Sequence, residues 1–195
     1  MKRIFAILLC LLFPVHALAF SGAIQAVLSA GGGVSCASCN SSNDSVIFQS
    51  ENGGNGDSSL WANWYSQPFT IAAGKCVTGV TFRAWDSGSN NSLVMEIFTN
   101  NSGAPGSRVG DGYTVSVSEA NVPNTDSGET QYLFAATQTL PAGSYWIVAK
   151  TSALMNYRFD NAGQTLGKVS SNSGSSWAAN SDHGFIMSVL GCNPS

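Results

Sequence analysis

The sequence predicts an all-β protein, folded as a single antiparallel β-sandwich of jelly-roll type with about eight or nine strands. Two observations support this fold class. Apolar and polar residues alternate with period two in short runs, such as Val80 to Trp85 and Leu93 to Phe98, which is typical of strands with one buried face. Clusters of Gly, Pro, Asn and Ser separate the runs, and the chain shows no convincing amphipathic helix.

Residues 1–19 have the pattern of a secretion signal. Lys2 and Arg3 precede an apolar run from Ile4 to Val15, and Ala17-Leu18-Ala19 has the small-x-small pattern of a cleavage site. The apolar run is too short to span a membrane as a helix, and the C-terminus carries neither an apolar tail nor a sorting signal. The expected location is therefore secreted, extracellular or at the cell surface, with no membrane span.

The charge of the predicted mature chain excludes some partners. Without Lys2 and Arg3 the 8 basic residues fall to 6, against 11 acidic residues, so the net charge becomes −5. No basic stripe is present to neutralise phosphates, so nucleic acid and anionic membranes are not expected partners. The abundance of Ser, Asn, Gly and Thr gives a polar, weakly charged surface, which is compatible with sugar contact but does not indicate it.

Four cysteines remain after the predicted cleavage: Cys36, Cys39, Cys76 and Cys192. In an exported chain they are expected to form two structural disulfides. Either Cys36 pairs with Cys39 and leaves Cys76 for Cys192, or the N-terminal segment is crosslinked to both other cysteines. A redox motif would need a helix after the CxxC, and a zinc site is disfavoured because the chain has a single CxxC and export favours oxidation.

Residues 20–44 are predicted to be a leader that contains the CxxC, and residues 45–195 the sandwich domain. In the leader, Ile24, Val27 and Leu28 have helical spacing, but the segment is too short to form a stable helix alone. Two interpretations are open. The segment is a flexible leader or first edge strand, or it docks onto a neighbouring subunit.

The first predicted strand of the domain is Ser45 to Gln49, and a loop from Glu51 to Ser59 follows. In this loop Glu51 and Asp57 are candidate calcium ligands, because Ca²⁺ prefers carboxylate oxygens. The spacing differs from an EF-hand loop, and Gly-Asn-Gly-Asp is also ordinary turn sequence. No other cofactor is expected.

The domain is predicted to be organised around a central hairpin within Gln67 to Gly106. The alternating runs form its two strands, and Asp86 to Asn91 forms the turn that brings the second strand beside the first. Later strands are expected at Tyr113 to Ser118, Gln131 to Ala135, Ser144 to Lys150, Met155 to Asp160 and Gly184 to Leu190.

Four aromatic residues are candidate ligand contacts: Trp85, Trp177, Trp61 and Tyr65. Exposed aromatic rings stack on sugars, whereas buried ones stabilise the core. Trp85 and Trp177 are the better candidates because Ser, Asn and Gly surround them. Trp61 and Tyr65 belong to an aromatic cluster that equally suits the core, and Trp146 is expected to be core because it lies in a predicted strand.

Three motifs occur in order along the chain: Gln67-Pro68-Phe69-Thr70, Gly103-Ala104-Pro105-Gly106-Ser107 and Leu140-Pro141-Ala142-Gly143-Ser144-Tyr145-Trp146. Over about residues 60–150 this set resembles the exported bacterial β-sandwich modules of surface and choice-of-anchor type proteins. The resemblance implies structural roles only. It implies that Phe69 and Trp146 are core, that Pro105-Gly106 is a turn and that Gly143 opens a strand.

The leading functional hypothesis is a secreted, non-catalytic module, adhesin-like or carbohydrate-binding-like, whose partner is an extracellular polysaccharide or a surface protein. The alternative is a structural subunit of an extracellular filament, coat or matrix that self-assembles through its N-terminal segment. A third hypothesis is a glycan-processing enzyme using Glu96, predicted to face outward, or His183. An enzyme is not expected, because acid–base residues are sparse and no Gly-x-Ser-x-Gly motif is present.

Overall fold

A computed structural model describes residues 36, 39, 45–50, 56–60, 63–72, 74–86, 92–126, 128–134, 139–152, 154–160, 167–180 and 184–193. These residues belong to one unit, residues 34–195. The predicted signal sequence and the predicted leader, apart from Cys36 and Cys39, lie outside the described residues. In the part of the chain that is described, no helix has the length and hydropathy needed to cross a membrane.

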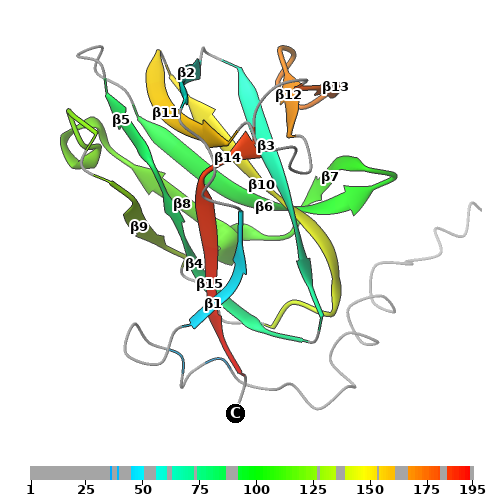
Figure 1. Ribbon diagram of the computed structural model, residues 1–195. Helices are drawn as coiled ribbons and strands as arrows, with labels where there is room; N and C mark the ends of the chain where they lie inside the picture. The colour runs from blue at the N-terminus through cyan, green and yellow to red at the C-terminus, as the bar shows by residue number, and fades with distance from the viewer. Residues whose placement is uncertain are drawn as a thin grey trace, which may run out of the picture. The chain divides into compact units, whose positions relative to one another are not determined.

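The described residues form 15 strands and two short 3-10 helices (Figure 1). The first eight strands are β1 (Ser45–Gln49), β2 (Gly56–Leu60), β3 (Trp64–Ile71), β4 (Cys76–Phe82), β5 (Ala84–Asp86), β6 (Leu93–Asn101), β7 (Ala104–Arg108) and β8 (Thr114–Val117). The others are β9 (Thr130–Leu133), β10 (Gly143–Thr151), β11 (Met155–Asp160), β12 (Lys168–Ser170), β13 (Ala178–Ala179), β14 (Gly184–Phe185) and β15 (Met187–Cys192). The 3-10 helices are η1 (Asp111–Tyr113) and η2 (Glu119–Asn121).

The strands form three sheets. Sheet I has the order β1-β15-β4-β9, and Figure 1 shows β15, in red, between β1 and β4. Sheet II has seven strands in the order β13-β12-β3-β10-β6-β7, with β8 also paired to β6. Sheet III has the order β14-β11-β2, with β5 also paired to β11. Every strand pairing among the described residues is antiparallel, which confirms the predicted antiparallel all-β sandwich.

One hydrophobic core lies between the three sheets, because each sheet turns an apolar face inward. Aromatic pairs connect the sheets. Phe48 of sheet I lies 6.2 Å from Phe69 of sheet II, measured between ring centroids. Phe82 of sheet I lies 5.0 Å from Phe185 of sheet III. Phe69, which the motif resemblance placed in the core, is 2% exposed.

Sheet II has a second apolar cluster on its outer face. Along β6 and β10 the side chains alternate, so that Ile97 and Ile147 face the main core while Phe98, Trp146 and Val148 face outward. Trp146 is buried, as expected, with 3% of its surface exposed, but it lies in this outer cluster and not in the main core.

The predicted central hairpin is wrong. The alternation is present, since Val80, Phe82 and Ala84 are buried, but these strands do not pair with β6. β4 pairs with β15 and β9 in sheet I, β5 pairs with β11 in sheet III, and β6 pairs with β10, β7 and β8 in sheet II. The period-two pattern determines which face is buried but not which strand is the neighbour.

Several strands are shorter than expected because the chain changes sheet within a predicted strand. Gly184 to Leu190 divides at Ile186 into β14 of sheet III and β15 of sheet I. The alternating run from Val80 to Trp85 divides at Arg83 into the end of β4 in sheet I and β5 in sheet III. The backbone N–H of Arg83 donates a hydrogen bond to the carbonyl of Ile186 at 3.4 Å. The two points at which the chain passes between sheet I and sheet III therefore lie side by side.

Two predicted turns are strands. The C-terminal part of the expected 51–59 loop is β2, in which Asp57 lies opposite Arg158 of β11. Pro105 and Gly106 lie within β7, whereas the turn before it is formed by Ser102 and Gly103, which have φ angles of 51° and 83°. Glycine accepts positive φ without strain, so the turn forms at Gly103 and the following Pro-Gly continues as an edge strand.

The cysteines form the pairing that crosslinks the N-terminal segment. Cys36 is bonded to Cys76, and Cys39 is bonded to Cys192. Cys76 and Cys192 are opposite each other in the register of β4 and β15. The N–H of Cys39 donates to the carbonyl of Cys36 at 3.0 Å, which keeps the CxxC compact enough to reach both strands.

Candidate functional site

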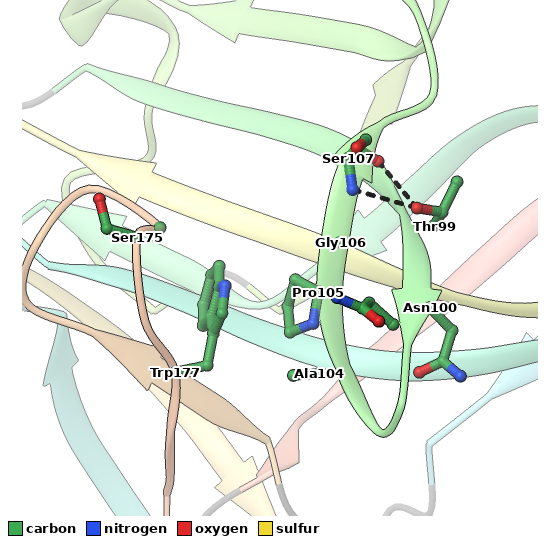
Figure 2. A pocket seen from close by; sticks show the side chains of 10 residues that line it. Thr99, Asn100, Ala104, Pro105, Gly106, Ser107, Ser175 and Trp177 are labelled. Carbon is green, nitrogen blue, oxygen red and sulfur yellow. Dashed lines mark hydrogen bonds between the residues drawn. The ribbon is translucent and has the colours of Figure 1, made fainter.

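An open pocket of about 610 Å³ lies on the outer side of sheet II, between the β6–β7 hairpin and the loop that joins β12 to β13 (Figure 2). The hairpin contributes most of the lining and the loop contributes the aromatic ring. The lining residues are Thr99, Asn100, Asn101, Ala104, Pro105, Gly106, Ser107, Gly174, Ser175 and Trp177.

The hairpin side of the pocket is fixed by side-chain hydrogen bonds. The Thr99 Oγ1 atom accepts from the N–H of Ser107 at 3.1 Å and donates to its carbonyl at 3.2 Å (Figure 2). The Asn100 Oδ1 atom accepts from the N–H of Gly103 at 3.2 Å and from Trp146 Nε1 at 2.9 Å. The bonds within the hairpin satisfy polar groups that would otherwise bind water. The bond from Trp146 attaches the hairpin to β10.

At Gly106 the two strands approach closely. A Cβ atom there would lie 2.8 Å from Thr99 Oγ1 and 3.0 Å from Asn101 Cβ. Only glycine avoids this crowding without moving the opposite strand. The floor of the pocket therefore depends on Gly106.

The loop side of the pocket is held by a local hydrogen-bond network. The Ser170 Oγ atom accepts from the N–H of Gly174 at 2.8 Å and donates to Asn172 Oδ1 at 2.8 Å. The same Asn172 Oδ1 accepts from the N–H of Ser176 at 2.9 Å. Side chains of Ser and Asn commonly stabilise turns in this way. The network places Trp177 at the mouth of the pocket.

Gly174 brings this loop onto the sheet. It has a φ angle of +83°, and a Cβ atom there would lie 2.7 Å from the Cζ3 atom of Trp64. The Trp64 ring packs edge-on against Phe98, with ring centroids 6.4 Å apart and an interplanar angle of 68°. Trp64 and Trp177 both pack against the outer cluster. The apolar face of β3, β6 and β10 thus supports the loop.

An ionic group lies beside this cluster on the same face. Glu96 is 5% exposed and forms ion pairs with Lys150 and, at 3.4 Å, with Arg108. Arg108 also pairs with Asp111 at 2.5 Å. The Lys150 ammonium lies 3.7 Å from the centroid of the Trp64 ring, a cation–π distance. Because Glu96 has two cationic partners, its charge is compensated inside the fold.

The pocket combines one aromatic face with uncharged polar groups. Trp177 is half-buried, and Figure 2 shows its indole ring opposite the ring of Pro105. The side chains of Asn101, Ser107 and Ser175 are exposed or open to the pocket and have no hydrogen-bond partner among the described residues. None of the ten lining residues is charged. This combination suits an uncharged ligand with an apolar face and several hydroxyl groups.

The structure separates the four aromatic candidates. Trp177 lines the pocket. Trp85 is half-buried in β5 of sheet III, opposite Asn156, and does not line it. Tyr65 is 8% exposed and packs in the main core 6.4 Å from Tyr157, so this candidate is corrected to a core residue. Trp61 lies outside the described residues.

Sequence reasoning did not identify the polar lining residues or Pro105 as parts of a site. Partial signals are present in the sequence, because Pro105-Gly106 is expected to be a turn and Ser173-Gly174-Ser175 is also a turn-forming sequence. A turn pattern does not show that two distant turns meet. The β6–β7 hairpin and the 171–177 loop come together only because β6 and β12 belong to the same sheet.

The other predicted site residues do not gather at the pocket. Asp57 lies in β2 of sheet III, and Glu51 lies outside the described residues, so the calcium hypothesis stays a prediction. Glu96 lies on the outward face, as expected, but is buried in ion pairs. His183 and the N-terminal docking segment lie outside the described residues, so the self-assembly hypothesis also stays a prediction.

No protein-family model and no curated protein matches the chain. Solved structures that share its fold include two of a clostridial surface protein. One is the structure of the cysteine protease and lectin-like domains of Cwp84, a surface layer associated protein of Clostridium difficile, with 13% identity and a TM-score of 0.56. The other is a structure of a variant of the clostridial cysteine protease Cwp84 after propeptide cleavage, with 14% identity and a TM-score of 0.55. Each match covers 80% of this chain but only 37% and 42% of the two Cwp84 chains, so the similarity shows a shared fold over part of a larger protein.

Proposed function

We propose that this protein is a non-catalytic extracellular module that binds carbohydrate through the Trp177 pocket. The observation that supports it most is the lining itself: one half-buried indole beside the buried Pro105, surrounded by amide and hydroxyl groups with no charge. A sugar ring has an apolar face of C–H groups and a rim of hydroxyls. The C–H groups pack on the electron-rich face of an indole, and the hydroxyls exchange hydrogen bonds with Asn and Ser side chains.

The fold comparison supports the same proposal at a coarser level. One of the two similar structures contains lectin-like domains of a surface layer associated protein. The all-β fold of this chain is expected to correspond to a lectin-like domain and not to the protease domain. A position at the cell surface or outside the cell also agrees with the secretion signal that the sequence predicts.

The module is proposed to be non-catalytic because its pocket lacks acid–base groups. The ten lining residues include no Asp, Glu, His or Cys. Glycoside hydrolysis uses two carboxyl groups on opposite sides of the bond. Glu96, the carboxylate that the third hypothesis would use, is paired with Lys150 and Arg108.

The test is affinity electrophoresis of the protein through gels that contain neutral polysaccharides, with Trp177→Ala beside Trp85→Ala. Both substitutions remove a half-buried indole, but only Trp177 lines the pocket. We expect Trp177→Ala to lose at least about tenfold in affinity, as befits one aromatic stacking contact, and Trp85→Ala to keep it. Circular dichroism shows whether both variants fold. Equal loss in the two folded variants, or retention by Trp177→Ala, would contradict the proposal.

A further inference from the structure

We infer that the four cysteines form a thiol-reactive site, at which an external thiolate attacks Cys39 and the two disulfides then exchange partners. The products are a bond between Cys36 and Cys39 and a bond between Cys76 and Cys192. In the structure the CxxC is bonded to both strands, and after the exchange it is bonded to neither. The inference does not depend on the proposed function, because no cysteine lines the Trp177 pocket.

The sulfur atoms of the two disulfides are neighbours. The four cysteine side chains pack as a cluster of their own, apart from the main core. The Sγ atoms of Cys39, Cys76 and Cys192 all lie within 4.8 Å of one another, although Cys76 is bonded to Cys36. Disulfides exchange when a thiolate attacks a nearby disulfide sulfur. The atoms that must react are therefore already close together.

The strands already hold Cys76 and Cys192 as a pair. The two residues are opposite each other in the register of β4 and β15. Opposite residues of antiparallel strands have Cα atoms about 4.5–5.5 Å apart, within the range of about 4.4–6.8 Å that disulfides span. The Lys75 Nζ atom donates a hydrogen bond to Asn193 Oδ1 just beyond the pair, so the strand ends stay aligned when either disulfide opens.

The CxxC is also shaped to close on itself. The N–H of Cys39 donates to the carbonyl of Cys36 at 3.0 Å, which is the hydrogen bond of a four-residue β-turn. The ends of such a turn have Cα atoms less than about 7 Å apart, which overlaps the range of a disulfide. Both new bonds thus join residues that the fold already brings together.

Exposure selects the sulfur that an external thiolate attacks. Cys39 is half-buried, whereas Cys36, Cys76 and Cys192 are each at most 6% exposed. An attacking thiolate needs access to the disulfide sulfur. The Cys36–Cys76 bond is therefore shielded from direct attack and reacts only through its neighbour.

The exchange has three steps. The external thiolate attacks Cys39 Sγ, forms a mixed disulfide and releases the Cys192 thiolate. That thiolate attacks Cys76 Sγ, forms the Cys76–Cys192 bond and releases the Cys36 thiolate. The Cys36 thiolate attacks Cys39 Sγ, closes the CxxC bond and releases the external thiolate. Each step breaks one sulfur–sulfur bond and forms another, so the thiol is a catalyst and no net oxidant or reductant is needed.

The experiment incubates the whole oxidised protein with reduced and oxidised glutathione at about pH 8, where part of the glutathione is thiolate. The reaction is quenched with acid, free thiols are blocked, and the denatured protein is digested with trypsin without reduction. Cleavage after Lys75, Arg83 and Lys168 puts the CxxC, Cys76 and Cys192 on three peptides. The present disulfides join all three. We expect the CxxC peptide to separate with an internal disulfide while the other two become joined.

The matched control is the double variant Cys39→Ser with Cys192→Ser, which retains only the shielded Cys36–Cys76 bond. We expect glutathione to enter the wild type first at Cys39, and to enter this variant at least about tenfold more slowly. Three peptides that remain joined, reduction to four thiols without the new pairing, or first attack at another cysteine would overturn the inference.

A second double variant, Cys36→Ser with Cys39→Ser, tests the strand geometry directly. With oxidised glutathione present, Cys76 and Cys192 should bond to each other, and circular dichroism shows whether the variant is folded. Two thiols or two glutathione adducts in the folded variant would show that the strands do not hold these cysteines within bonding reach. If the variant does not fold, the peptide map of the wild type decides.

Discussion

The two faces of sheet II are built from the same strands but differ in composition and in role. On the inner face, residues such as Met95, Ile97 and Ile147 join a mainly apolar core shared by three sheets, in which the buried Gln67 accepts a hydrogen bond from the N–H of Phe185 at 3.1 Å. On the outer face, Phe98 and its apolar neighbours lie beside the ion pairs of Glu96. The inner face is covered by the other two sheets, whereas, among the residues that the structure describes, the 171–177 loop lies over the outer face.

The two faces of sheet II differ in what they contribute: the inner face stabilises the fold, and the outer face positions the elements around the pocket. Apolar packing stabilises a fold without requiring particular partners, so the inner face tolerates similar side chains of equal volume. Buried ion pairs add little net stability, but they need specific partners in a specific geometry. The outer face therefore fixes where the 171–177 loop and the β6–β7 hairpin stand, and the candidate pocket lies between these two elements.

The largest expected effect comes from matched truncations on the two faces. Phe69→Ala should lower the free energy of unfolding by about 3–5 kcal/mol, because the cavity in the three-sheet core cannot collapse. Phe98→Ala should cost about 3 kcal/mol or less, since Phe98 is 8% exposed and its cover is a loop that can settle inward. Urea denaturation measures both values, and Phe69→Leu serves if Phe69→Ala does not fold. A larger loss for Phe98→Ala would reverse the assignment of the main core.

The next largest effect is expected at Glu96. Glu96→Gln leaves the Lys150 ammonium, whose side chain is 20% exposed, without its partner, and should lower the free energy of unfolding by about 2–3 kcal/mol. Arg108→Gln is the control, since that side chain is 46% exposed and should cost less than about 1 kcal/mol. Adding Lys150→Met to Glu96→Gln should recover part of the loss. If the double variant is as unstable as the single one, the ion pair is not the cause.

A smaller effect is expected at the glycine that seats the loop. Gly174 and Gly103 both have a φ angle of +83°, so alanine at either position costs about 1 kcal/mol in backbone strain. A Cβ at Gly174 also meets Trp64, whereas a Cβ at Gly103 meets nothing within 4 Å. Gly174→Ala should therefore cost about 1–2 kcal/mol more than Gly103→Ala and weaken sugar binding. Equal stabilities and equal affinities for the two variants would mean that Trp64 does not hold the loop.

The smallest effect is a pH dependence of the free energy of unfolding that arises in the main core. Burial, and to a lesser extent the Tyr145 phenol, raises the pKa of Tyr113 from 10.0 to about 12. Below pH 10 the phenol is protonated in both states and its contribution is complete. Between pH 10 and pH 12 the unfolded chain releases the proton while the folded chain retains it, so stability falls as pH rises.

Thermal or urea unfolding at pH 9 and pH 11 measures this dependence. The free energy of unfolding should fall by about 1 kcal/mol through Tyr113 alone over this interval. Burial also raises the pKa of Tyr132 and Tyr145, so the wild-type protein should lose more. Tyr113→Phe should lose less than the wild type over the same interval. An identical loss in both proteins would show that Tyr113 does not titrate differently on folding.

Some elements were predictable residue by residue. The expected strands Ser45 to Gln49 and Met155 to Asp160 coincide with β1 and β11. The alternating run from Leu93 was correctly expected to be a strand, with Met95 and Ile97 turned toward the core. These successes share a cause, because side-chain alternation and turn preference are local properties of the chain.

Other elements were not predictable, for reasons that also have a physical basis. The alternating run around Val80 was assigned the wrong neighbour, since alternation is the same whichever strand lies beside it. The sequence favoured Trp85 and Trp177 over Tyr65 but could not separate Trp85 from Trp177, because burial of an aromatic ring depends on the sheet opposite it. Only the fold showed that Tyr65 is core and that Trp177 stands across from Pro105.

By itself, the sequence determined the all-β class, the position of many strands, the face that each alternating run buries, and the two open choices for four cysteines. The tertiary structure decided which strands are neighbours, that Cys36 and Cys39 each bond to a different strand, and which distant turns meet at a pocket. Local preference acts between residues a few positions apart. Register, disulfide pairing and the pocket depend on contacts between residues far apart in the chain, which form only when the sheets pack together.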